Sequence, residues 1–171
     1  MLLAGIKPQE VYQGTETANG KVAVGTRGFD SNGKEYIFCL VAASQNLVTG
    51  NLVTLISTGT GANFGTVTIL GTGGAAPGLG TPLGVCVSSI TASASSYIWV
   101  QVYGSCNVSI TDATASNLPG HLVIPASVSG AVRASGVATA SSFIEGLVFT
   151  ATASTGSTGA MFLSYPRLTA A

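Results

Sequence analysis

Residues 97–103 read YIWVQVY, and this stretch decides the class of fold. Side chains of an extended strand alternate between its two faces, so Ile98, Val100 and Val102 share one face, which we expect to line a hydrophobic core. The opposite face carries the aromatic and polar side chains Tyr97, Trp99, Gln101 and Tyr103. The pattern predicts a β-strand buried on at least one side.

Similar short segments rich in β-branched residues occur on both sides of this stretch. We predict strands at Asn51–Ser57, Thr66–Leu70 and Leu83–Ile90, separated by Gly, Ser, Thr and Pro. A hairpin is predicted where KVAVGTRGF (residues 21–29) and KEYIFCLVA (residues 34–42) flank an Asn-Gly pair, since both residues of such a pair readily adopt positive φ. No segment has sustained helical periodicity, so the sequence predicts an all-β protein made of small antiparallel sandwich or barrel units.

The second half of the chain resembles the first. NLVTGNLVTL (46–55) is similar to NLPGHLVIPA (117–126), and PLGVCVSS (82–89) is similar to IEGLVFTA (144–151). We therefore predict a duplicated β unit: a first β domain at residues 21–111 and a second unit, packed on it, at residues 112–171.

Residues 1–20 show no periodicity and contain Pro8, Gly14 and a polar GTETANG stretch. We interpret them as an extended N-terminal arm that becomes ordered only against another surface. The first ten residues lack the cationic and apolar regions of a secretory signal, so none is expected.

Charged residues are only 7% of the chain and the net charge is zero. Nucleic-acid binding is not expected, because no excess of Lys or Arg is present to neutralise phosphates. No apolar run approaches the length that crosses a bilayer, so no membrane partner is expected. So few ionic groups give little protection against association, which favours an oligomer or a lattice.

The residue types that perform catalysis are scarce. His121 is the only histidine, and outside the N-terminal region only Asp112 and Glu145 carry carboxylates, so we predict no enzyme. Gly71, Gly73 and Ala76 match the spacing of a dinucleotide-binding turn, but prolines follow where a helix is required, so no cofactor is predicted. The three cysteines, Cys39, Cys86 and Cys106, lack metal-site spacing and are expected to be buried, with no metal bound.

The order of several motifs resembles that of the small Gly/Ala/Thr-rich decoration, or cement, proteins on the capsids of tailed bacteriophages. These motifs are the polar arm, NLVTGNLVTL, a glycine-rich turn, PLGVCVSSI (82–90) and YIWVQVYGSCNVSI (97–110). The resemblance implies a structural virion protein that binds the outside of the shell, is present in the host cytoplasm during assembly, and bridges capsomers. Its implied partners are the major capsid protein and, as a homotrimer, itself.

This reading assigns two candidate sites. The arm would contact the capsid through Lys7, Pro8, Glu10, Val11, Tyr12 and Glu16. The aromatic face at Tyr97, Trp99 and Tyr103 would contact another subunit; the alternative, which the alternation of this strand favours, is that a second layer of the same chain covers it.

Two other functions fit the same composition. One is a phage tail or head-fibre protein, in which small-residue β structure builds trimeric stalks. The other is a carbohydrate-binding β-sandwich, in which Tyr97, Trp99 and Tyr103 form a platform for sugar rings.

Overall fold

Within the residues that it describes, the computed structural model contains twelve strands and no helix. It describes residues 2–4, 6–13, 22–42, 45–57, 64–71, 78–91, 96–111, 118–119, 121–135, 142–152 and 158–170. The strands of the first part are β1 (Leu2–Ala4), β2 (Tyr12–Gln13), β3 (Arg27–Phe29), β4 (Glu35–Val41), β5 (Leu52–Ser57), β6 (Phe64–Ile69), β7 (Leu83–Cys86) and β8 (Ser96–Ser109). Those of the second part are β9 (Leu122–Pro125), β10 (Val132–Ser135), β11 (Ser142–Phe149) and β12 (Thr158–Ala170). The predicted all-β class is confirmed.

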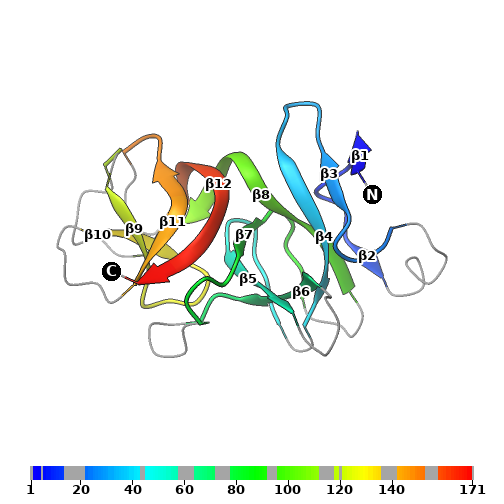
Figure 1. The fold of residues 1–171 in the computed structure, drawn as a ribbon, viewed down its shortest axis with the longest axis horizontal. Helices are drawn as coiled ribbons and strands as arrows, with labels where there is room; N and C mark the ends of the chain where they lie inside the picture. Colours follow the sequence, from blue (N-terminus) through cyan, green and yellow to red (C-terminus); the bar gives the residue numbers. More distant parts are fainter. Residues whose placement is uncertain are drawn as a thin grey trace.

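Five of these strands close a barrel, in the order β4-β6-β5-β7-β8 and back to β4. All neighbours are antiparallel except β4 and β6. Closure leaves no free edge between these strands, which suits a chain with few charges to protect an edge. In Figure 1 the barrel lies to the right, β9–β12 lie to the left, and the two termini lie at opposite ends.

Strand β8 is longer than the predicted segment 97–103, because it changes partner along its length. Its first part pairs with β4 and β7, and from Tyr103 onward it pairs with β12. Gly104 lies at the change of partner with φ 99°, a backbone conformation that a side chain disfavours. One strand therefore belongs to the barrel and to the second group of strands.

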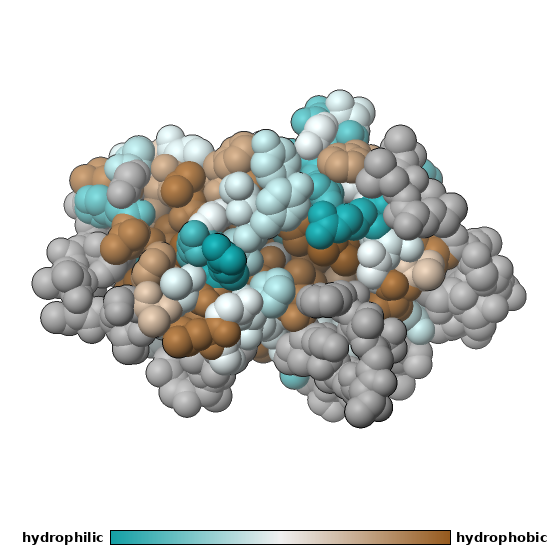
Figure 2. Space-filling view, viewed as in Figure 1, coloured by the Kyte–Doolittle hydropathy of each residue, from teal (hydrophilic) through white to brown (hydrophobic). Residues whose placement is uncertain are grey.

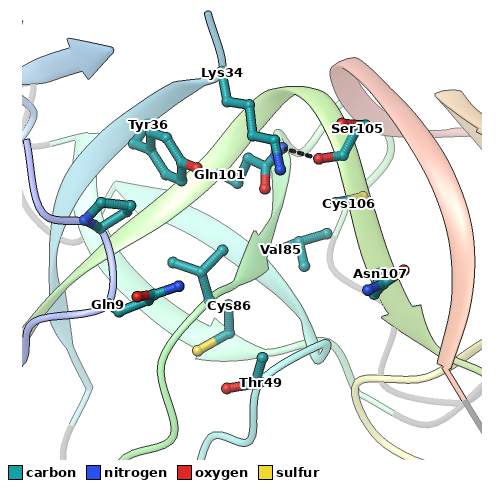
Figure 3. Close-up of a pocket in the computed structure, with 12 residues that line it drawn as sticks. Gln9, Lys34, Tyr36, Thr49, Val85, Cys86, Gln101, Ser105, Cys106 and Asn107 are labelled. Atoms are coloured by element: carbon teal, nitrogen blue, oxygen red, sulfur yellow. Dashed lines mark hydrogen bonds between the residues drawn. The ribbon is translucent and has the colours of Figure 1, made fainter. Parts of the chain in front are cut away.

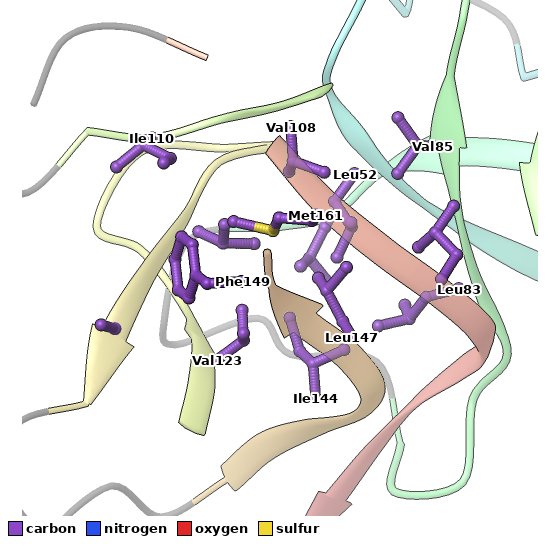
Figure 4. Close-up of a cluster of buried hydrophobic side chains, with 14 of the residues drawn as sticks. Leu52, Leu83, Val85, Val108, Ile110, Val123, Ile144, Leu147, Phe149 and Met161 are labelled. Atoms are coloured by element: carbon purple, nitrogen blue, oxygen red, sulfur yellow. The ribbon is translucent and has the colours of Figure 1, made fainter. Parts of the chain in front are cut away.

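The molecule has two main hydrophobic cores that share a wall. Inside the barrel lie mostly small side chains: Cys39, Val41, Leu47, Val53, Leu55, Val67, Cys86, Ile90, Ile98, Val100 and Val102. The second core, shown in part in Figure 4, gathers Phe149, Met161 and Leu163 from the later hairpin and takes Leu83 and Val85 from β7. Alternate residues of β7 thus face the two cores, and all four of its residues are buried.

The predicted hairpin at Asp30–Gly33 forms, but its turn differs from the prediction. Gly33 adopts φ 75°, whereas Asn32 does not have positive φ. The Asp30 side chain instead fixes the loop, because its Oδ1 accepts the backbone N–H groups of Asn32 at 2.8 Å and Lys34 at 3.0 Å. A carboxylate that binds its own turn removes the need for positive φ at Asn32.

Pairing in the second half follows that in the first. β5 and β6 form a hairpin, and β7 pairs with β8; correspondingly, β9 pairs with β10, and β11 pairs with β12. One difference is that β5 hydrogen-bonds to β7 within the large sheet. In the second half, β9 and β10 form a separate two-stranded sheet, and β9 only packs against β11. This order of pairing agrees with the predicted duplication, which stays a prediction.

Candidate functional site

The arm residues that the structure describes lie against strand β3 and the barrel of their own chain. β1 adds a parallel strand to the edge of β3, and β2 adds an antiparallel pair to the start of β8. Between them Ile6 enters a slot whose floor is Gly28: a Cβ on Gly28 would lie 2.7 Å from the Ile6 methyl Cγ2 and 3.2 Å from Trp99 Cζ3. The absence of a side chain at Gly28 therefore admits Ile6.

Aromatic rings line the rest of this groove. Phe38 packs at 5.1 Å from Trp99, at 5.7 Å from Tyr97 in a parallel arrangement, and at 5.4 Å from the arm's Tyr12, edge to face. The two candidate sites that the sequence kept apart, the arm and the aromatic face of β8, are thus one contact. We call it the arm groove: Gly28, Phe38, Tyr97 and Trp99, with the arm seated on it.

This burial corrects the assignment of Trp99 to a subunit interface or a sugar platform. Trp99 is only 1% exposed, so neither another subunit nor a sugar ring can reach its face while the arm is seated. Trp99 is instead covered by residues of its own chain, as the other alternative expected. The indole Nε1 makes no hydrogen bond of normal geometry, and the Tyr12 hydroxyl is the group that interacts with it, so the ring is held mainly by packing.

The outer side of the seated arm carries its charges. Lys7 and Glu10 form an ion pair at 3.1 Å, with side chains 76% and 48% exposed, and the Tyr12 hydroxyl donates to Glu10 at 3.0 Å. Pro8 and Val11 are half-buried. Glu16, the remaining predicted contact, lies outside the described residues.

A hollow of about 290 Å³ lies beside the arm, between it and strands β4, β7 and β8 (Figure 3). Ser88 Oγ donates to the carbonyl oxygen of Pro8 at 3.2 Å and so fixes the arm at this rim. Gln101 is buried in the wall and donates to the carbonyl oxygen of Ser105 at 2.9 Å. Lys34 reaches over the mouth, and no acidic partner for it is found within the described part of the chain.

Two of the three cysteines line this hollow. Burial raises the pKa of Cys86 to about 11 and that of Cys106 to about 12. Burial also raises the pKa of Cys39, inside the barrel. Cys39 and Cys86 are buried as predicted, whereas Cys106 is half-buried. A neutral thiol is a poor nucleophile, so we infer that these groups serve packing.

We expect all three thiols to resist modification in the folded protein. With 5,5′-dithiobis(2-nitrobenzoate) at pH 8, little reaction should occur until urea unfolds the chain, after which three thiols should react. Rapid reaction of one thiol before unfolding would contradict the burial described above.

A second cluster joins the later strands to the hairpin of β3 and β4. Tyr165 has φ 49°, the only positive φ among the described non-glycine residues. It lies in a bulge where three residues of β12 oppose Gly146 alone. Its hydroxyl donates to Glu35 Oε2 at 2.6 Å, and Arg27 pairs with Oε1 of the same carboxylate at 2.5 Å.

Tyr103, the third predicted interface residue, belongs to this second cluster. Its ring stacks near Tyr165 with centroids 5.6 Å apart and meets Phe162 edge to face at 5.4 Å. Tyr103 is 37% exposed and Tyr165 is 51% exposed. The structure therefore separates Tyr103 from Tyr97 and Trp99, and the three cannot form one platform.

Replacing Tyr165 with phenylalanine should weaken this joint. Hydrogen bonding to the Glu35 carboxylate raises the pKa of Tyr165 above its ordinary value near 10, so its contribution to stability is present below about pH 10 and is lost as pH rises through the folded-state value. We expect Tyr165→Phe to lower the free energy of unfolding by about 1 kcal/mol at pH 8, since the side chain is half exposed. Urea unfolding should show this difference shrinking above pH 10; a difference independent of pH would contradict the role of the hydroxyl.

No sequence model of a known protein family matches the chain, and a search of curated protein sequences finds no match. Within the described ranges, no three His, Cys, Asp or Glu side chains gather as a metal would require, and no helix is long and apolar enough to span a membrane. Asp112 lies outside those ranges.

Several residues of these two sites were not singled out in the sequence. No sequence pattern pointed to Ile6 or Gly28, because the two fit together only after the arm folds back onto β3. Phe38 lies in a predicted strand, but only the pairing of β4 with β8 puts it beside Trp99. Glu35 and Tyr165 are 130 residues apart.

Proposed function

We propose that this chain is a structural virion protein that binds the outer surface of a phage capsid and bridges neighbouring capsomers. The sequence resemblance suggests this function. The observation that carries it is the state of the carboxylates, because carboxylates that are already paired can be buried against another protein at a lower desolvation cost than unpaired ones.

Every carboxylate among the described residues has a partner within the chain. Glu10 pairs with Lys7, Glu35 with Arg27, and Glu145 with Arg167 at 2.7 Å. Asp30 binds its own turn and accepts the Tyr36 hydroxyl at 3.1 Å. Such a surface neither repels a second copy nor attracts a polyelectrolyte.

Apolar side chains are scattered between these pairs. The exposed large ones are Val24, Val48, Leu79, Tyr103, Leu118, Leu122, Val128, Val148 and Tyr165. Figure 2 shows hydrophobic residues in several separate patches on one face, with small hydrophilic areas between them. Many modest contacts of this kind, repeated over a shell, can add up by avidity.

The outer side of the seated arm is the proposed capsid contact, with Lys7 and Glu10 at its centre. In this proposal the arm contacts the capsid while it remains seated on its own barrel, and not as a free extended segment. The described strands β3–β12 would then support a short polar surface.

Co-sedimentation with expanded, undecorated shells tests this proposal. The shells are assembled from the major capsid protein encoded in the same genome. Saturable binding at micromolar protein is expected, and absence of binding would overturn the proposal; a stable trimer that ignores shells would favour a fibre protein instead. The double variant Lys7→Ala/Glu10→Ala should bind about tenfold more weakly with an unchanged circular dichroism spectrum. Thr150→Ala, at an exposed polar residue just after β11, serves as the control.

A further inference from the structure

We propose that the arm groove is a peptide-binding site for the arm of a second copy of this chain, so that neighbouring copies can exchange residues 2–13. This inference concerns contact between copies and does not depend on the capsid.

The groove has the two features by which sheets recognise extended peptides. Backbone pairing supplies affinity: β1 extends the sheet at the edge of β3 in the register Leu2–Arg27, Leu3–Gly28 and Ala4–Phe29. A side-chain slot supplies specificity: Ile6 sits over Gly28 and against Trp99, where any Cβ on Gly28 would displace it. An arm from another copy would make the same contacts, because it has the same sequence.

The same segment is fixed at two further points. Ser88 holds the Pro8 carbonyl, and β2 pairs Tyr12 with Tyr97 and Gln13 with Ser96. Both contacts are made by residues within 6–13. The described part of the arm, residues 2–4 and 6–13, therefore forms one stretch of contacts that can be transferred together.

Only the covalent link between the arm and its own barrel favours binding of the arm to its own groove over the groove of another copy. Residues 14–21, GTETANGK, join β2 to the barrel; eight residues span up to about 28 Å when extended. A short tether gives the arm an effective concentration of about the millimolar range at its own groove. Exchange should therefore be slight in dilute solution and substantial where copies are crowded at comparable concentrations, as in an assembly.

An empty groove would be costly, which favours exchange over simple release. Without the arm, Trp99 and Phe38, now 1% and 0% exposed, would face water beside an unpaired strand edge. An arm that leaves one groove gains most by entering another.

Disulfide trapping between two full-length variants tests the exchange. The donor carries Tyr12→Cys and the acceptor carries Tyr97→Cys, since these positions face each other across β2 and β8. The pair is mixed at about 1 mM, the range of the tethered arm's effective concentration. The mixture is warmed to just below the unfolding midpoint, cooled and oxidised. A single chain with both substitutions, oxidised at low micromolar concentration, shows that the positions can bond.

The expected result is a donor–acceptor disulfide formed at least tenfold more than with a control acceptor carrying Val148→Cys, on the exposed face of β11. Adding Gly28→Val to the acceptor should abolish most of this excess, because the new side chain fills the Ile6 slot. Equal yields with the two acceptors would overturn the exchange. Failure of the double variant to close within one chain would overturn the groove itself.

Discussion

Replacing Gly146 with alanine is expected to lower the free energy of unfolding by about 3 kcal/mol or more, the largest loss expected for a glycine-to-alanine change among the described glycines. Gly146 has φ 77°, which costs a side chain about 1–2 kcal/mol. A Cβ would also overlap the carbonyl oxygen of Ser164 and lie 3.2 Å from Pro166 Cα. Both neighbours are backbone in the bulge of β12, so neither can rotate away.

Urea unfolding followed by far-ultraviolet circular dichroism measures this loss. Gly33→Ala is the matched control, because Gly33 has nearly the same φ, 75°, but nothing within 4 Å of an added Cβ. It should lose only the conformational part, about 1–2 kcal/mol. Equal losses at the two glycines would show that the close approach at the bulge does not exist.

Replacing Trp99 with alanine is expected to lower the free energy of unfolding by about 3–5 kcal/mol, the usual cost of emptying a large buried aromatic site. Trp99 is 1% exposed and packs on Phe38 and Ile6, so its loss also removes one wall of the arm groove. The variant should therefore lose arm docking before the barrel unfolds. Proteolysis should cleave the arm of folded Trp99→Ala and spare that of the parent protein.

Trp99→Phe separates packing from polarity at the same position. Phenylalanine leaves a smaller void than alanine and removes an indole N–H that makes no hydrogen bond of normal geometry, so the loss should be only about 1–2 kcal/mol. Val148→Ala, at a side chain 48% exposed, should change stability by less than about 1 kcal/mol. A loss at Trp99→Ala no larger than at Val148→Ala would refute the buried position of the ring.

Much of the fold was predictable because the signal is local. Alternation in Tyr97–Tyr103 correctly placed Ile98, Val100 and Val102 inside, and the buried, β-branched runs around Leu52 and Leu83 are strands. The end of β8 was missed, because pairing with β12 carries the strand beyond Tyr103. The residues of a strand do not show which neighbouring strand it will pair with.

The candidate site was predictable only in pieces. The sequence singled out Tyr12 and Tyr97, but for two different surfaces; in the structure they are paired residues of β2 and β8. It placed Trp99 and Tyr103 on one face, and the change of partner at Gly104 gives them different neighbours. Whether the capsid and the second subunit are the partners stays a prediction.

The sequence by itself determined that the chain builds strands and that few ions remain at its surface, because period-two hydrophobicity and composition act locally on every segment. Only the tertiary structure decided that the arm closes over Trp99, that Glu35 meets Tyr165, and that β7 faces two cores. These contacts join residues tens to more than a hundred positions apart. Their free energy comes from surface buried when the whole barrel closes, which no single segment encodes.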